Sequence, residues 1–253
     1  MPREDCAASC PWRSKQVIEE LLPESVAAVE AHTDDPLWDS PLFPGEEALV
    51  ARAVPKRRRE FAAVRGCARS AMEKLGVPPQ AVVSGERGAP QWPAGVVGSM
   101  THCAGYCAAA LVRATDLVSL GIDAEPLGAL PEGVGASVFL PVESARLDRL
   151  AARWPGVHWD RLLFSAKESV YKAWFPLTRK WLDFSEADIT LRPDTGDASR
   201  GTLRAELLVP GPLVGAGRLQ VFEGRWAVGD QVLATSVVIP HPAAPEDRAT
   251  TPA

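Results

Sequence analysis

The sequence predicts a fold that combines α-helices with β-strands, and three segments carry this prediction. Apolar side chains recur at helical spacing within residues 45–75, and residues 117–123 alternate as a half-buried strand does. Residues 189–239 contain a series of short strand-like runs. With 253 residues, the chain can bury a large core, either as one domain or as two small lobes.

The first third of the chain is expected to be mostly helical. Residues 1–14 are expected to be poorly ordered, and residues 14–32 are predicted to form a helix that is interrupted near Pro23. Residues 45–75 predict a long helical region in which Pro55 is a candidate break, and Gly76 supplies its C-terminal stop.

The middle of the chain alternates strands and helices. Residues 98–102 predict a short strand or a turn, whereas residues 106–113 suit a strand or a helix equally. Residues 117–123 predict a strand with one apolar face. Two helices are then expected, over residues 141–154 and over residues 158–174, the second ending at Pro176.

The last third is expected to be β-structure. The predicted strands cover residues 189–191, 202–208, 218–222, 225–228 and 232–238. Glu223 and Gly224 suit a hairpin turn between two of them. Residues 241–253 are rich in Pro, Ala and acidic side chains and are expected to form a disordered tail.

Composition and charge exclude several classes of protein. Hydrophobic residues make up 46% and charged residues 23%, which is ordinary for a soluble globular protein. The net charge of -5 argues against a general nucleic-acid binder. No apolar run reaches the roughly 18 residues of a membrane span, and the N-terminus lacks the apolar core of a signal peptide. A cytoplasmic protein with no membrane partner is therefore expected.

The cysteines predict reduced thiols. Five is an odd count, which suits a reducing compartment. His102, Cys103 and Cys107 superficially resemble half of a zinc site, but no second pair with ligand spacing follows. Buried apolar thiols are the favoured interpretation.

Two carboxylates follow the predicted strand. Asp123 and Glu125 stand two apart, so their side chains leave an extended chain on the same side, and Pro126 ends the strand there. Such a pair suits a hard cation such as Mg²⁺. Two solvated acids at an exposed strand end fit as well, and so short a pattern favours this plainer interpretation.

A second acidic element lies on the helix predicted for residues 158–174. Glu168 and Lys172 stand four apart and share one face, where they could meet a metal and a phosphate. Two plainer interpretations remain: a capping box that starts at Ser165, or a simple surface ion pair. The apolar residues before Ser165 place the helix start near Asp160, which makes Ser165 interior. Lys167 is expected to face solvent or to have no defined role.

Two motifs in this order resemble the Sfp/EntD-like 4′-phosphopantetheinyl transferases. They are Gly121-Ile-Asp-Ala-Glu125 and Phe164-Ser-Ala-Lys-Glu-Ser-Val-Tyr-Lys172. Further similar segments are Arg57–Phe61, Arg65–Arg69, Gly85–Pro90, Gly98–Cys103 and Trp174–Trp181, the last similar to actinobacterial type II members. The resemblance covers roughly residues 45–240, and two long motifs at the right spacing are more specific than either alone.

The resemblance implies an activity and its catalytic residues. Such enzymes transfer the 4′-phosphopantetheine group of coenzyme A to a serine of an apo acyl or peptidyl carrier protein, which yields the holo carrier and 3′,5′-ADP. By motif position, Asp123, Glu125 and Glu168 would hold Mg²⁺, with Mn²⁺ as a possible substitute. Glu168 would also take the serine proton, directly or through water, and Lys172 would neutralise charge on the leaving phosphate.

The resemblance also implies residues that bind coenzyme A. Arg57, Arg65 and Arg87 would clamp its phosphates, because the guanidinium fork suits phosphate oxygens. Thr101 and His102 would meet the same nucleotide. Asp123, Glu168 and Lys172 would face the pyrophosphate. Ser84 departs from relatives that carry Lys at this position, which makes the assignment of Arg87 less direct.

The implied fold is α+β, with two similar lobes related by pseudo-twofold symmetry and an active site in the cleft between them. The lobes would span residues 15–117 and 118–240, and the chain would be a monomer. Carrier proteins are typically acidic, so docking on this acidic chain would use a local patch, for which residues 179–181 are one candidate and an ordinary exposed loop is the equal alternative.

Other classes remain open at this point. A different Mg²⁺-dependent phosphoesterase or nuclease could use the same three carboxylates, and a non-catalytic protein could bind coenzyme A or a carrier. The sequence does not choose among carriers of fatty acid, polyketide, nonribosomal peptide or siderophore biosynthesis.

Overall fold

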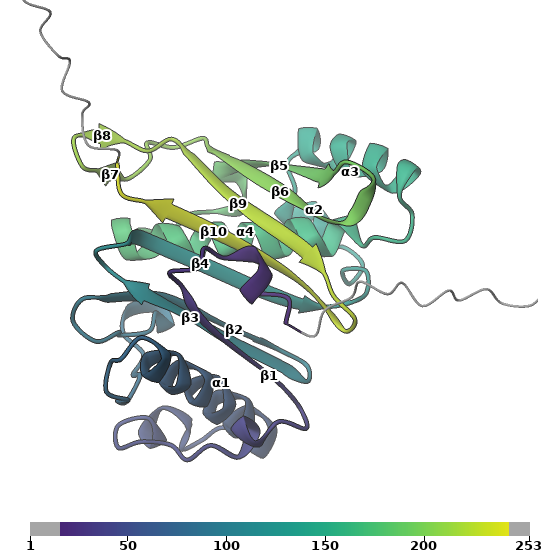
Figure 1. Ribbon diagram of the computed structural model, residues 1–253. Coiled ribbons are helices and arrows are strands. Elements are labelled where there is room, and N and C mark those ends of the chain that lie inside the picture. The colour runs from purple at the N-terminus through teal and green to yellow at the C-terminus, as the bar shows by residue number, and fades with distance from the viewer. Residues whose placement is uncertain (1–15, 243–253) are drawn as a thin grey trace, which may run out of the picture.

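Two large antiparallel sheets and the helices that cover them make up most of the described part of the chain, residues 16–242 of a computed structural model (Figure 1). The three-stranded sheet has the order β1-β3-β2, and the five-stranded sheet has the order β4-β10-β9-β6-β5. The disorder expected for residues 1–14, and for the tail from residue 243 on, lies outside the described residues.

The three-stranded sheet is built from the N-terminal half. Its strands are β1 (Ala27–His32), β2 (Val96–Cys103) and β3 (Tyr106–Arg113), and α1 (Pro55–Lys74) packs against one face. The central strand β3 is buried on both faces, with Leu111 toward α1 and Val112 toward the other sheet. A strand buried on both faces reads as a continuous apolar run, which explains why its periodicity fitted a helix as well.

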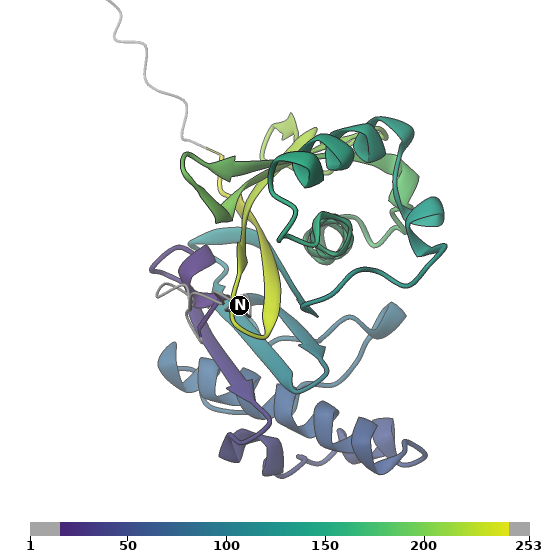
Figure 2. The same cartoon turned by 90° about the vertical axis from the view of Figure 1, so that its right-hand side faces the viewer.

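The five-stranded sheet is built from the C-terminal half. Its strands are β4 (Leu117–Pro126), β5 (Ala187–Asp194), β6 (Asp197–Leu207), β9 (Val221–Val228) and β10 (Val232–Pro240). The helices here are α2 (Val134–Val138), α3 (Pro141–Arg153) and α4 (Trp159–Thr178). Figure 2 views α4 nearly end-on, beside this sheet.

Short elements complete the described chain. They are the 3₁₀ turns η1 (Glu19–Leu21), η2 (Pro36–Asp39), η3 (Glu47–Val50), η4 (Glu86–Gly88) and η5 (Phe184–Glu186), and the paired β7 (Leu213–Val214) and β8 (Gly217–Arg218). No described helix has the length and apolar character to cross a membrane.

Helix α4 lies directly on strand β4 because Gly121 has no side chain. A Cβ atom at Gly121 would lie 2.0 Å from the carbonyl oxygen of Ser169, well inside van der Waals contact. Two residues earlier on β4, the Ser119 hydroxyl donates a hydrogen bond of 2.8 Å to the carbonyl of Ala173, one turn further along α4. This close contact sets Glu168 and Lys172 over the end of β4, where the two acidic residues stand.

The two sheets meet along β2 and β4 through side chains rather than through a backbone ladder. The backbone amide of Ile122 donates to Ser99 Oγ at 3.0 Å, and that of Ala124 donates to Thr101 Oγ1 at 3.1 Å. The hydroxyl groups of alternate β2 residues therefore accept the hydrogen bonds of the β4 backbone amides. These bonds hold β2 and β4 together at the centre of the molecule.

Four sequence predictions of elements were wrong. In place of the helix predicted for residues 14–32, the described residues 16–32 hold η1 and then β1, because residues 27–32 pair with β3 over their whole length. Helix α4 continues past Pro176 to Thr178: the proline cannot donate the usual hydrogen bond, but the amide of Arg179 still donates to the carbonyl of Phe175 at 2.8 Å. Residues 218–222 do not form one strand, because β8 ends at Arg218 and β9 begins at Val221.

The fourth error concerns Glu223 and Gly224. They lie inside β9 rather than in a turn, and Gly224 is needed because a Cβ there would lie 1.9 Å from the carbonyl oxygen of Ser236. The turn follows at residues 229–231, where Gly229 donates to the carbonyl of Val232.

Candidate active site

A cavity of about 780 Å³ is lined by α1, the loop of residues 84–92, β2 and α4. Its volume suits a ligand of nucleotide size. Six of the residues predicted for the site line it: Arg57, Arg65, Arg87, His102, Glu168 and Lys172. Residues more than 100 positions apart in the sequence are thus brought to one cavity.

Asp123 lies behind this cavity with one oxygen satisfied and one free. Its side chain is 7% exposed, and its Oδ1 accepts hydrogen bonds from Lys172 Nζ at 2.7 Å and from Thr101 Oγ1 at 3.1 Å. Its Oδ2 is buried and has no hydrogen-bond partner in the described residues. Buried carboxylate oxygens are normally paired, so this oxygen is suited to a ligand that the protein itself does not supply.

Glu168 sits beside Asp123 at the junction of two cavities. It lines the large cavity and also a small one of about 90 Å³. Burial raises the pKa of Glu168, the Asp123 and Glu125 carboxylates raise it further, and Lys172 opposes them. A carboxyl group with a raised pKa is suited to proton transfer or to charge neutralisation by a cation.

The capping-box interpretation of Glu168 is wrong. Helix α4 begins at Trp159, so Ser165 is interior, and its hydroxyl is hydrogen-bonded to Thr235 Oγ1 at 3.0 Å. The surface-pair interpretation is wrong as well, because the salt bridge of Lys172 is made to Asp123.

Glu125 is held by an arginine that the sequence analysis did not identify. Arg161 Nη1 donates to Glu125 Oε2 at 2.8 Å. Burial and the Asp123 charge raise the pKa of Glu125, and Arg161 lowers it. Arg161 stands seven residues before Glu168, so it shares a helix face with it, and this spacing was the available signal. Among residues 16–242, no three acidic, His or Cys side chains form a ready metal-ligand cluster.

The opposite side of the cavity is basic. Arg57 Nη1 is hydrogen-bonded to His102 Nε2. Burial, together with the positive charges of Arg57 and Lys172, lowers the pKa of His102 to about 4. A neutral histidine held between cations indicates a place for an anion.

Arg65 extends this basic side from deeper in α1. Its guanidinium lies 3.3 Å from the centroid of the Phe61 ring, and its Nη2 donates to Ser84 Oγ at 3.4 Å. Burial lowers the pKa of Arg65 to about 10, so the side chain remains charged near neutral pH. Ser84 stands where some relatives carry Lys, and here its hydroxyl accepts a hydrogen bond from Arg65.

Two arginines at the rim adopt an unusual backbone conformation. Arg87 (φ 53°) and Arg179 (φ 55°) are the only non-glycine residues with positive φ among residues 16–242, and both line the large cavity. The Arg87 guanidinium lies 5.5 Å from the Trp181 ring, so residues from both halves of the chain meet here.

Thr101 and Lys167 do not lie where the sequence analysis expected them. Alternation along β2 turns His102 toward the cavity and Thr101 toward β4, where its buried hydroxyl contacts Asp123 instead of lining the cavity. The Lys167 side chain is 2% exposed, so it does not face solvent. Cys107 is buried with its Sγ 3.6 Å from that of Cys67, as expected for apolar thiols.

Two family models match the chain. The N-terminal domain model of 4′-phosphopantetheinyl transferases matches residues 45–112, and the 4′-phosphopantetheinyl transferase superfamily model matches residues 119–211. The chain therefore belongs to the 4′-phosphopantetheinyl transferase family, and it is an enzyme of that class. This confirms the resemblance read from the two motifs and decides against the two alternative classes.

Several curated relatives are actinobacterial. The 4′-phosphopantetheinyl transferase Svp of Streptomyces mobaraensis is 57% identical over 230 residues, which cover 90% of this chain and 91% of the relative. Npt of Nocardia iowensis is 49% identical over 87% of this chain and 99% of its own length, and PptT of Mycobacterium tuberculosis is 46% identical over 85% and 93%. The enterobactin synthase component D of Salmonella typhi is 33% identical over 56% of each chain.

Proposed function

We propose that this enzyme transfers the 4′-phosphopantetheine group of coenzyme A to a serine of an apo carrier protein, in a Mg²⁺-dependent reaction. The observation that carries the proposal is the buried, unpaired Oδ2 of Asp123, beside Glu168 and Lys172 and across one cavity from a basic cluster. One end of the site carries carboxylates, which can hold a cation against a pyrophosphate, and the other end carries arginines, which can bind a separate phosphate. The two ends together suit a substrate that carries both groups.

The basic side would bind the nucleotide. Arg57, Arg65 and His102 line the large cavity, and within residues 16–242 Arg65 forms no salt bridge although the Glu46 charge acts on it. We assign the 3′-phosphate and part of the pyrophosphate to these three side chains, with Arg87 at the rim. Thr101 is assigned a supporting contact to Asp123 in place of a direct contact with the nucleotide.

The acidic side fits a hard divalent cation. The donor set is all carboxylate oxygen, which Mg²⁺ and Mn²⁺ both accept, and Asp123 Oδ2 is already buried without a partner. Asp123 and Glu168 would hold the ion, and Glu125 would join them by exchanging its bond to Arg161. When bound, the cation supplies charge neutralisation for the pyrophosphate.

The protein's own groups then perform the transfer. Glu168 would accept the proton of the carrier serine, directly or through one water, and the serine oxygen would form a bond to the phosphorus that carries pantetheine. The bond between that phosphorus and the bridging oxygen would break, which releases 3′,5′-ADP. Lys172 lines the same cavity, and its ammonium group would neutralise the charge that develops on the leaving phosphate.

The arrangement of the sheets supports a two-lobed architecture, which we also propose. Each sheet carries one long helix, α1 or α4, of 20 residues. Residues 114–116 join β3 to β4, which agrees with a boundary between lobes 15–117 and 118–240. The lobes would be related by pseudo-twofold symmetry within a monomer, with the active site between them, and the enzyme would work in the cytoplasm.

Intact-mass spectrometry of a carrier protein tests the function. The enzyme is incubated with coenzyme A, Mg²⁺ and one of several apo carriers, and we expect the carrier to gain one phosphopantetheine. The Glu168→Ala variant should lose the gain. Unmodified apo carriers throughout would contradict the transferase proposal, and release of 3′,5′-ADP without any carrier would indicate a hydrolase instead.

A further inference from the structure

Lys167 is a buried lysine immediately before Glu168 on α4. Its Nζ donates to the carbonyl oxygens of Phe184 at 2.7 Å and Ala187 at 2.9 Å, and it forms a salt bridge of 2.9 Å with Glu143 Oε2. These three contacts use every hydrogen of the ammonium group. The family match does not explain why a lysine with no access to the large cavity should stand here.

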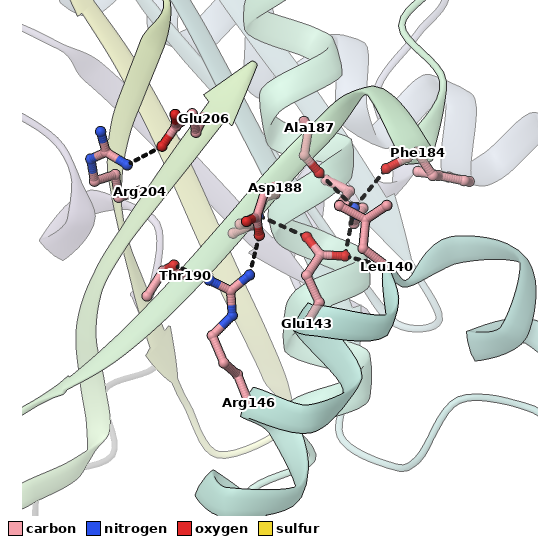
Figure 3. A network of polar contacts seen from close by, with 11 residues as sticks. Leu140, Glu143, Arg146, Phe184, Ala187, Asp188, Thr190, Arg204 and Glu206 are labelled. Carbon is pink, nitrogen blue, oxygen red and sulfur yellow. Dashed lines mark hydrogen bonds and ion pairs between the residues drawn. The ribbon is translucent and has the colours of Figure 1, made fainter. Parts of the chain in front are cut away.

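Glu143 completes the arrangement from α3. Its side chain is fully buried, its Oε2 also accepts from the amide of Leu140 at 2.8 Å, and its Oε1 accepts from the amide of Ile189 at 2.7 Å. Figure 3 shows Glu143 reaching from the start of α3 toward Ala187 and Phe184. One ion pair therefore ties three elements together: α4, the first turn of α3, and the start of β5.

On the side that faces β4 and β10, α4 is held by close packing, by hydrogen bonds and by the salt bridges of Arg161 with Glu125 and of Lys172 with Asp123. Gly121 lets the helix rest on β4, and the hydroxyl of Ser169 is hydrogen-bonded to Thr235 of β10. These contacts fix the distance of α4 from the sheet. Rotation of the helix about its own axis is opposed from the far side by the salt bridge of Lys167.

Rotation of α4 matters because Glu168 is the next residue. Side chains at consecutive helix positions point about 100° apart, so an anchor at position 167 determines where the carboxylate of position 168 points. Glu168 and Lys167 also both line the small cavity, so the two side chains flank the same wall. A shift of about 1 Å at a catalytic group can reduce a rate by about 100-fold.

We propose that Lys167 and Glu143 are positioning residues, which hold α4 so that Glu168 faces Asp123 at the distance a divalent cation requires. The proposal rests on the proposed function, since it takes Glu168 as a metal ligand. A buried ion pair is seldom retained for stability alone, because apolar replacements of similar volume are often as stable. Its value here is the geometry that it sets.

The test compares Lys167→Met with Lys74→Met. Lys74 also donates to a backbone carbonyl, that of Ala28, but it stands at the far end of α1 from this site, so it controls for the loss of such a bond. Because Lys167→Met leaves Glu143 buried without its partner, the double variant Lys167→Met/Glu143→Leu is measured beside it.

Three quantities are measured on each protein. They are the affinity for Mn²⁺ by electron paramagnetic resonance without carrier, the affinity for 3′,5′-ADP without metal, and kcat for carrier modification. For both Lys167 variants we expect Mn²⁺ affinity to fall about 10-fold or more, as for the loss of a group that orients metal ligands. We expect kcat to fall about 10- to 100-fold. Binding of 3′,5′-ADP should stay within about twofold of wild type, because all its proposed ligands except Lys172 lie outside α4: Arg57, Arg65, Arg87 and His102.

Two results would overturn the proposal. One is a folded double variant with wild-type Mn²⁺ affinity and kcat. The other is a parallel loss of Mn²⁺ and 3′,5′-ADP binding, which would indicate a general structural role. A wild-type protein that modifies no carrier would instead contradict the proposed function, and the Mn²⁺ comparison would still report on the position of Glu168.

Discussion

At the scale of single residues, the site depends on how Asp123 is held. Its Oδ1 accepts one hydrogen bond from Thr101 of β2 and one from Lys172 of α4. Its Oδ2 has no partner among the described residues. The carboxylate is therefore oriented before any ligand binds, which removes the need to order it during the reaction.

Replacing Thr101 by Val tests this orientation. The variant removes the donor to Asp123 and also leaves the buried amide of Ala124 without its acceptor. We expect kcat to fall about tenfold, and the free energy of unfolding to fall by about 1–3 kcal/mol. Rates from carrier mass and urea unfolding measure the two effects. Thr101→Ser keeps the hydroxyl and should be close to wild type, and a similar loss in that variant would argue against the hydrogen bond as the cause.

His102 gives a prediction about pH. Its pKa in the folded enzyme is lowered to about 4 from the ordinary 6.5, so the unfolded chain binds the proton more tightly. Neutral His102 therefore contributes stability that is present above pH 6.5 and is lost as the pH falls toward 4.

The measurement is the free energy of unfolding by urea across this pH range. We expect wild type to lose more stability than His102→Gln as the pH falls. His158→Gln, at an exposed position before α4, is the control and should follow wild type. Parallel curves for wild type and His102→Gln would show that this histidine is not held neutral by its surroundings.

At the scale of elements, the contact between α4 and β4 brings the two motifs together. Each motif supplies one side of it: Gly121 from the first and Ser169 from the second. The glycine of the first motif is therefore explained by packing, and the acidic residues that follow it are the ones proposed to take part in the chemistry.

Gly121→Ala should separate these elements. The added methyl group would meet the backbone of α4 at Ser169 and Ala173, and backbone cannot move aside as a flexible side chain can. We expect a loss of about 1–3 kcal/mol in the free energy of unfolding, with a lower kcat in the molecules that remain folded. Gly76→Ala, where a Cβ would meet nothing within 4 Å but φ is +65°, separates steric overlap from backbone strain. Equal losses of activity in both variants would contradict the steric explanation.

The sequence predicted the elements that carry the site better than those that support it. The strand over residues 117–123 and the helix around Glu168 were confirmed, because each has a clear period and flanking stop signals. The strand β1 was missed, since its pairing with β3 is a long-range contact that local propensity does not contain. The same limit applies within the site, where Arg161 and Glu143 act through partners many residues away.

At the scale of the whole molecule, net charge sets the condition for meeting a carrier. The chain carries -5, and an acidic carrier would be repelled at long range, so encounter requires a local basic surface. Lys180 and Trp181 are exposed directly after α4, and Trp181 is within reach of Arg87 at the rim of the large cavity. This position, next to the proposed site of transfer, favours the docking interpretation of residues 179–181 over an ordinary loop.

Charge reversal at Lys180 tests the docking surface. We expect Lys180→Glu to raise the KM for an acidic carrier about 3- to 10-fold, which corresponds to roughly 0.7–1.4 kcal/mol, and to leave the KM for coenzyme A unchanged. Arg149→Glu makes the same change of charge on the exposed face of α3, away from the large cavity, and isolates the effect of position from that of net charge. The difference between the two variants should shrink as salt is added, because screening weakens exposed charges. Equal carrier KM values for both variants at low salt would mean that the carrier docks elsewhere.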